Sequence, residues 1–171
     1  STTRALGLGR AAIALAAVGA LLVAVAPFFD PAAPIMANYI PVIDAPVFLS
    51  GLAAFAAGTA LLVLRGLLAS PLVGARLDGA GALRFGINAS LVACAVALLA
   101  FAWSFAAVPR ALEPRAYYEL AFWGGGHVLQ FAWTLLLLVA WLVLADASGL
   151  RVPISPRVVT LLFALQLVAV F

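Results

Sequence analysis

Long apolar stretches separated by short polar connections dominate the chain. Four of them contain no Lys, Arg, Asp or Glu and reach the roughly 20 residues that a helix needs to cross a hydrocarbon layer of about 30 Å. They cover about 11–29, 45–64, 85–108 and 120–145. Backbone N–H and C=O groups at that depth must form their hydrogen bonds within the segment, because no water is available there. The chain also lacks the alternation of apolar and polar residues that is typical of membrane β-barrel strands. We therefore predict an all-α, polytopic transmembrane helix bundle.

A fifth apolar run, 158–171, stops where the chain stops. Its 14 residues make about 21 Å of helix, too little to span, so we expect a truncated fifth span. Because the chain also begins at Ser1, we expect 1–171 to be a single transmembrane domain that is a fragment of a larger membrane protein. The alternative is a complete small protein with a short re-entrant tail.

The composition agrees with this pattern and narrows the chemistry. With 67% hydrophobic and 9% charged residues and a mean hydropathy of +1.24, the chain is no ordinary soluble domain. One Cys, one His and one Met exclude a disulfide framework and a metal site completed by these residues alone. A net charge of +3 is too sparse for a nucleic-acid surface, so we expect a lipid bilayer and no nucleic acid as surroundings.

The arginines predict the topology. Two lie in the connection 109–119, and the other seven lie at the opposite ends of the spans: Arg4, Arg10, Arg65, Arg76, Arg84, Arg151 and Arg157. Positive residues favour the cytoplasmic side. We expect a multi-pass protein of the bacterial inner membrane with Ser1 in the cytoplasm and the connections 30–44 and 109–119 outside. The first of these is rich in proline, which predicts an ordered, extended cap over the bundle.

Small residues predict how the first two spans pack. Four alanines recur every four residues beside Gly19 in the first span, and three small residues line one face of the second: Ala12, Ala16, Ala20, Ala24; Gly51, Ala54, Gly58. Such spacing lets helix backbones approach closely. A substrate groove is the less common alternative.

The fourth span carries the candidate chemistry. Gly124, Gly125 and Gly126 lower helix propensity, which indicates that the backbone there must be thin or bent. The only histidine, His127, follows. Steps of three and four residues place it on one helix face with Gln130, Thr134, Leu138 and Trp141. Ionisable residues at membrane depth usually face a functional interior. At the outer boundary, Tyr117, Tyr118 and Trp123 are typical of an aromatic belt.

These residues alone leave alternatives open. His127 is either a metal or proton site or a neutral imidazole bonded to a neighbouring helix. Gln130 and Thr134 are either part of that site or hydrogen-bond partners between helices.

The string 118–131, YELAFWGGGHVLQF, resembles the sixth helix of catalytic subunit I in the haem-copper oxidase superfamily, in its nitric-oxide-reductase-like branch. Residues 38–44 resemble an outer loop of the same proteins. The resemblance implies a fragment covering about helices three to seven of a respiratory enzyme that reduces nitric oxide or dioxygen. It implies that His127 binds copper or non-haem iron facing a haem, with Gln130 and Thr134 beside this site or on a proton path.

The same resemblance implies that Gly124, Gly125 and Gly126 make room for the haem or metal. The other ligands would come from the remainder of the subunit, and electrons from a cytochrome c-type or quinol donor through a second haem. Phe131 departs from the family, because the commonest oxygen reductases have Tyr there and the usual nitric oxide reductases Glu. A non-catalytic membrane scaffold or assembly subunit, a degenerate paralogue and, less favoured, a transporter remain the alternatives.

Overall fold

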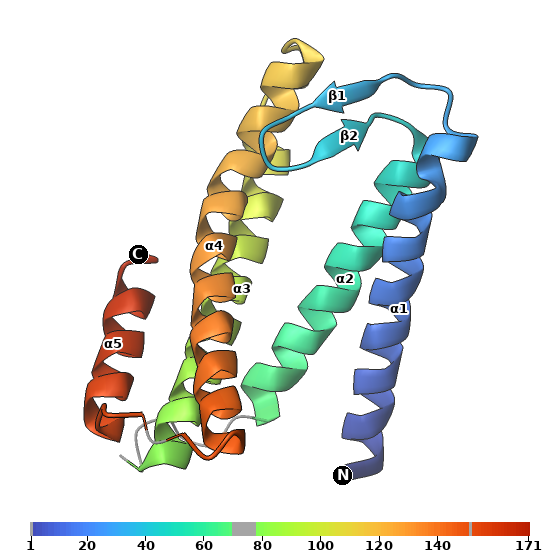
Figure 1. Ribbon diagram of the computed structural model, residues 1–171. Coiled ribbons are helices and arrows are strands. Elements are labelled where there is room, and N and C mark those ends of the chain that lie inside the picture. The colour runs from blue at the N-terminus through green and yellow to red at the C-terminus, as the bar shows by residue number, and fades with distance from the viewer. Residues whose placement is uncertain (1, 70–77, 151) are drawn as a thin grey trace. The chain divides into compact units, whose positions relative to one another are not determined.

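The computed structural model of the protein describes residues 2–69, 78–150 and 152–171, with side chains from residue 6 onward. Its elements are α1 (Thr2–Phe29), β1 (Pro34–Met36), β2 (Pro41–Ile43), α2 (Pro46–Ala69), α3 (Gly79–Ala107), α4 (Pro114–Ala147) and α5 (Pro156–Val168) (Figure 1). The first four helices are long and apolar enough to cross a membrane, and α5 is short. The all-α prediction is confirmed, and the chain is a multi-pass membrane protein.

Helices α3, α4 and α5 start before their apolar runs, and polar side chains cap their first turns. The amide of Gly81 donates to Oδ1 of Asp78 at 2.7 Å where α3 begins. The amide of Val158 donates to Oγ of Ser155, with Pro156 in the first turn of α5. Such side chains satisfy amides that have no partner within the helix. The predicted spans were correct in position but short. Of the arginines used for topology, Arg76 and Arg151 lie outside the described residues, as do Ser1 and the side chain of Arg4.

The chain forms two compact units. Unit 1 comprises Ser1–Arg65 and Leu98–Gly126, and unit 2 comprises Gly66–Ala97 and His127–Phe171. Helices α3 and α4 are each divided between the two units, with one segment in each unit. Helix α4 is continuous through its three glycines, so the backbone is not interrupted there.

In unit 1 the small residues of α1 and α2 form the predicted packing seam. A Cβ at Gly58 would lie 2.5 Å from the amide nitrogen of Ala16 and 2.7 Å from the carbonyl oxygen of Ala12, so two backbones meet here. A Cβ at Gly51 would lie 2.8 Å from the amide nitrogen of Val23. A Cβ at Gly19 would overlap the backbone of Phe55.

The predicted stripe of alanines was wrong in its second half, because Ala20 and Ala24 are exposed. The seam continues from Ala16 to Gly19 and Val23 instead. A helix has 3.6 residues per turn, so strict steps of four drift around it, whereas alternating steps of four and three stay on one face.

The proline-rich connection forms an ordered hairpin over one end of unit 1 (Figure 1). β1 and β2 pair antiparallel, with Ile35 opposite Val42. Val42 and Ile43 are buried in the unit's core, together with Phe48 of α2 and residues of α1 and α4. Asp30 closes the connection, because its carboxylate accepts hydrogen bonds from the amides of Val47 and Phe48 at 3.4 and 2.9 Å. The end of α1 thus caps the start of α2. The prediction of an extended cap was correct in kind but did not include strand pairing.

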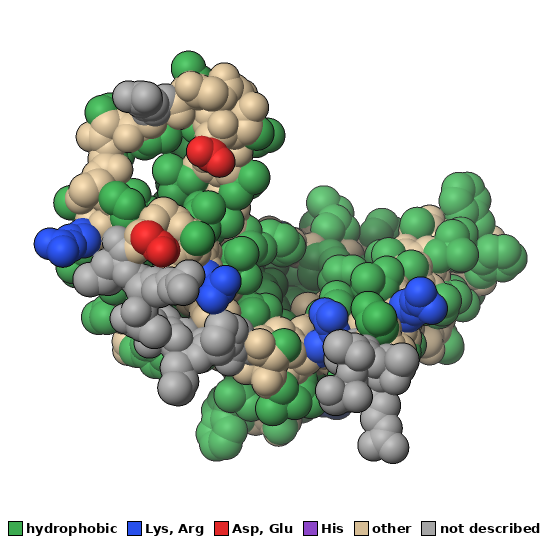
Figure 2. All heavy atoms as spheres, turned by 90° about the horizontal axis from the view of Figure 1, so that it is seen from below, with side chains coloured by type: hydrophobic (Ala, Val, Ile, Leu, Met, Phe, Trp, Pro, Cys, Tyr) green, Lys and Arg blue, Asp and Glu red, His purple; other side chains and the backbone are tan. Residues whose placement is uncertain are grey.

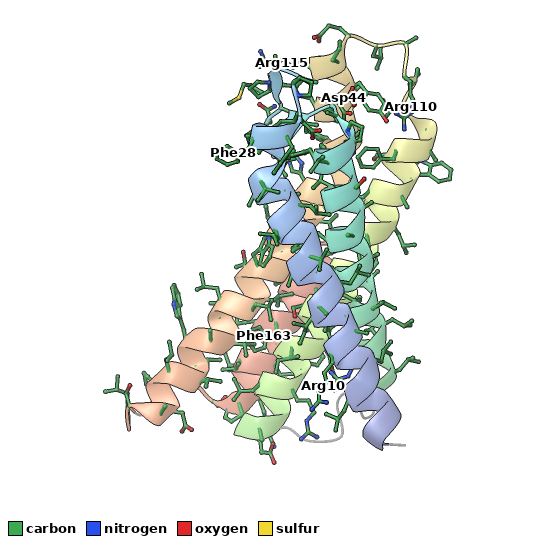
Figure 3. All side chains as sticks on the ribbon, turned by 90° about the vertical axis from the view of Figure 1, so that its right-hand side faces the viewer. Arg10, Phe28, Asp44, Arg110, Arg115 and Phe163 are labelled. Carbon is green, nitrogen blue, oxygen red and sulfur yellow. The ribbon has the colours of Figure 1, made fainter. Side chains whose placement is uncertain are left out.

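Unit 2 has a smaller core of its own. Leu135 and Val139 of α4 pack with alanines of α3 and with Phe163 of α5, which is 1% exposed and is labelled in Figure 3. A Cβ at Gly86 of α3 would lie 2.7 Å from Cε2 of Phe163. Many large hydrophobic side chains of the helices are exposed, whereas Figure 2, seen from below, shows arginine and acidic side chains at that end. Such a surface suits lipid.

Candidate functional site

His127 begins the part of α4 that belongs to unit 2, and its side chain is exposed. Gln130, Thr134 and Trp141 are also exposed, and Leu138 is partly buried. We call these five residues the His127 face. The structure places them on one side of α4, in agreement with their spacing.

Apart from Leu138, which packs at the edge of the core of unit 2, the His127 face does not point into that core. The buried residues of α4 in unit 2 are Ala132, Leu135 and Val139, which lie on another side of the helix. Within the described chain the His127 side chain lies on the surface. The cause is that α3 and α5 supply apolar partners for only one side of this helix segment.

Hydrogen bonding differs among the polar members of the face. Oγ1 of Thr134 donates to the backbone carbonyl of Gln130 at 2.8 Å, so this hydroxyl is satisfied by its own helix. The side-chain amide of Gln130 has no hydrogen-bond partner among the described residues. His127, in contrast, has an interaction partner among the described residues.

The three glycines have different surroundings in unit 1. A Cβ at Gly126 would lie 2.5 Å from Cδ1 of Tyr39, and a Cβ at Gly125 would lie 2.5 Å from Cδ1 of Phe101. These two rings already occupy the room that the glycines provide. A Cβ at Gly124 would have only Oγ of Ser104 nearby, at 4.0 Å. Thin backbone is therefore required at Gly125 and Gly126 by this chain's own aromatic rings.

The described residues do not complete a metal site around His127. No group of three or more His, Cys, Asp or Glu side chains that could hold a metal ion occurs among them. His127 can contribute one nitrogen ligand, and a stable site needs about three or four. These residues fit a metal only as one contributor to a site shared with other protein.

A second polar site lies at the hairpin end of unit 1. Asp44, Arg110, Leu112, Pro114, Tyr117 and Tyr118 line a cavity of about 120 Å³, which we call the hairpin cavity. Figure 3 labels Asp44 and Arg110 at this end. The Tyr118 hydroxyl donates a hydrogen bond to the Asp44 carboxylate, and the guanidinium carbon of Arg110 lies 5.4 Å from the centre of the Tyr117 ring.

The tyrosines of this site are core residues. Tyr117 and Tyr118 are 5% and 3% exposed, and their rings meet edge to face at 4.9 Å. Phe122 continues the cluster and meets Phe105 of α3 at 5.3 Å. The prediction of an aromatic belt was therefore wrong for both tyrosines, which the hairpin and α3 cover. It agrees with the position of Trp123, which is 59% exposed.

Glu113 fixes the start of α4 beside the hairpin cavity. Its carboxylate accepts hydrogen bonds from the amides of Arg115 and Ala116 at 3.1 and 3.0 Å. These amide hydrogen bonds favour the charged form and lower the pKa of Glu113. One turn later, Arg115 and Glu119 form an ion pair at 3.0 Å.

Sequence reasoning missed the hairpin cavity. Asp44 and Arg110 were considered only as loop charges, because nothing in their spacing shows that residues 66 positions apart line one cavity. The available signal was the pair Tyr117-Tyr118 close to two outer connections that both carry charge. Tyrosine hydroxyls in an apolar cluster require polar partners.

Comparison with known proteins adds one relative. No protein-family model matches the chain, and no solved structure matches it. An uncharacterized protein of Rickettsia prowazekii (strain Madrid E), RP382, is 29% identical over 119 residues, which cover 67% of this chain and 22% of the relative. The chain spans about a fifth of the length of the relative it matches.

Proposed function

We propose that this chain is part of a membrane respiratory oxidoreductase of the haem-copper type, in which His127 is one ligand of copper or non-haem iron. The observation that carries the proposal is the exposed His127 face within a helix that can cross a membrane. The resemblance of residues 118–131 to a metal-binding helix supports it from the sequence.

The energetics of a bilayer support a covered His127 face. Polar side chains at membrane depth cost free energy unless they are hydrogen-bonded, and they rarely face lipid. Gln130 has an amide without a partner among the described residues, one turn from His127. Further protein against this face would supply such partners. The relative is several times longer than the matched stretch, so further segments exist there.

The roles of the residues follow from their positions. A nitrogen of His127 binds the metal, and its other ring nitrogen is held by a hydrogen bond that fixes the tautomer. The amide of Gln130 and the hydroxyl of Thr134 hydrogen-bond beside it. When bound, a metal and an adjacent haem would supply the redox chemistry for reducing nitric oxide or dioxygen. Gly124 is the glycine with open space, so it is the one suited to a close cofactor.

The proposal also covers location and partners. We assign the chain to the bacterial cytoplasmic membrane, with its N-terminal side in the cytoplasm, on the asymmetry of its arginines. The remaining ligands come from the remainder of the subunit, and electrons come from a cytochrome c-type or quinol donor. The Glu113→Cys variant should react with an impermeant maleimide in intact cells. Reaction only after permeabilisation would reverse this orientation.

His127→Gln in the full-length protein tests the site. Glutamine keeps a polar, hydrogen-bonding side chain but is a poor ligand for copper or iron. We expect the metal content, measured by mass spectrometry, to fall to background together with nitric oxide or dioxygen consumption, with helical content unchanged. Leu136→Gln is the matched control, because it adds a glutamine at another exposed position of α4. Metal content and turnover that survive in His127→Gln would refute the site.

Two observations favour a second candidate, a non-catalytic membrane scaffold. Tyr39 and Phe101 account for two of the three glycines, and the Thr134 hydroxyl is satisfied by its own helix. For a scaffold, His127→Gln lowers the yield of the assembled complex and leaves the metal content per complex unchanged. The same variant therefore separates the two functions.

A further inference from the structure

The hairpin cavity holds two opposite charges that do not pair with each other. Asp44 and Arg110 both line it, and both are exposed, so solutes can reach them. No ion pair joins them within the part of the chain that the structure describes. Each is instead held by a tyrosine: Asp44 by the Tyr118 hydroxyl, Arg110 by the Tyr117 ring. A carboxylate and a guanidinium that line one cavity without pairing with each other are complementary to a ligand that carries both signs of charge.

A buried polar atom at the same place points to a ligand independently. Tyr117 lines the cavity, is 5% exposed, and its hydroxyl has no hydrogen-bond partner among the described residues. A buried hydroxyl without a partner is costly, and most such groups in folded proteins are satisfied. A ligand with hydrogen-bonding atoms would supply the missing partner.

The size of the cavity restricts the ligand. About 120 Å³ corresponds to about four water molecules at roughly 30 Å³ each. Sites for drug-sized ligands and cofactors have about 300–1,000 Å³, so a whole nucleotide is too large for this cavity. A small head group does fit. The cavity also lies at the start of α4, where a membrane-crossing helix meets the polar boundary and lipid phosphates are found.

We propose that the hairpin cavity binds a phosphoethanolamine group. Arg110 binds the phosphate oxygens, for which a guanidinium has matching paired donors. The Asp44 carboxylate accepts hydrogen bonds from the primary ammonium, and the Tyr117 hydroxyl hydrogen-bonds to the phosphate. The group comes either from a phosphatidylethanolamine lipid or from free phosphoethanolamine. This inference does not depend on His127 or on any metal.

The binding test uses the full-length protein in nanodiscs and measures which lipid it retains by native mass spectrometry. In equal mixtures of phosphatidylethanolamine and phosphatidylcholine, we expect the ethanolamine lipid to be retained preferentially, because a quaternary ammonium has no N–H to donate to Asp44. Arg110→Gln should lower retention by about tenfold, as the loss of a charge-assisted contact implies. Arg115→Gln is the matched control, because Arg115 pairs with Glu119 and does not line the cavity.

Two further variants assign the contacts. Asp44→Asn should abolish the preference for ethanolamine over choline, and Tyr117→Phe should weaken binding while leaving that preference intact. If Asp44→Asn does not fold, the Arg110→Gln and Tyr117→Phe results decide. Free phosphoethanolamine that displaces the lipid identifies the head group alone as the ligand, and failure to displace it identifies the intact lipid. Equal retention of both lipids, or unchanged retention in Arg110→Gln, would overturn the proposal.

Discussion

The two parts of α4 have opposite surroundings. In unit 1 its residues Tyr117, Tyr118 and Phe122 are at most 8% exposed, enclosed by the hairpin and by α3. In unit 2 the same helix buries one side only and leaves His127 and Gln130 exposed. The first part finds its packing partners within this chain. In the second part, the side-chain amide of Gln130 has no partner among the described residues, and further protein or a cofactor would satisfy it in a bilayer.

The difference shows where to look for function. In unit 1, polar residues stabilise the fold. The Asp30 carboxylate caps the start of α2, and the Glu113 carboxylate caps the start of α4. On the open part, polar residues contribute little to the packing of this chain, so another requirement must explain their presence. We therefore expect substitutions in the enclosed part to change stability through packing, and substitutions on the open part to change function.

Substitutions of Gly124 and Gly126 in α4 should give the largest difference in unfolding free energy. Gly126→Ala places a Cβ against the Tyr39 ring, so it should lower the free energy of unfolding by about 1–3 kcal/mol. Gly124→Ala meets only Ser104 at 4.0 Å and removes a poor helix former, so it should raise that free energy by up to about 1 kcal/mol. Unfolding of the two variants in detergent, followed by circular dichroism, provides the comparison. Equal effects would mean that Tyr39 does not pack on α4.

The glycines also show how far sequence reasoning reached. Helix positions followed from the length of the apolar runs, since a bilayer allows few alternatives. The spacing of His127, Gln130 and Thr134 correctly placed them on one side of α4. The spacing did not reveal that Tyr39, 87 positions before Gly126, fills the space that was assigned to a cofactor.

The same limit explains the other errors. Tyr117 and Tyr118 were expected at a lipid boundary, but a hairpin formed by a distant segment buries them. The hairpin cavity joins residues from two connections. Local periodicity predicts which residues share a helix face, but only the tertiary arrangement determines what covers that face.

Removal of the Asp30 cap should give the next largest effect. Asp30→Ala leaves the amides of Val47 and Phe48 without their acceptor, so the free energy of unfolding should fall by about 0.5–2 kcal/mol. Asp146→Ala is the matched control, since it removes the same charge near the C-terminal end of α4, where a carboxylate is not favoured. Chemical denaturation of both variants measures the difference. A larger loss in Asp146→Ala would contradict the capping role.

Glu113 makes the enclosed end sensitive to acid. Because the folded-state pKa of Glu113 is lowered, its contribution to stability is complete above the unfolded pKa of about 4.3 and is lost as the pH falls through the lower, folded value. Glu113→Gln should therefore have a flatter dependence of unfolding temperature on pH below about 4.3. Asp146→Asn serves as the control that removes a carboxylate elsewhere. Identical acid profiles for Glu113→Gln and the unmodified protein would show that the cap is not formed.

The smallest expected change in stability is on the open part. In Thr134→Val the lost hydroxyl hydrogen bond is internal to α4, and the side chain is exposed, so the free energy of unfolding should change by no more than about 0.5 kcal/mol. Thr160→Val in α5 is matched, because Thr160 makes the same type of bond to the carbonyl of Pro156 at 2.9 Å. Stability alone therefore does not distinguish the two threonines. Turnover of the full-length protein does: the oxidoreductase proposal requires a loss in Thr134→Val and none in Thr160→Val. Equal turnover in both variants would remove Thr134 from the proposed site and leave His127 and Gln130 as its only polar members.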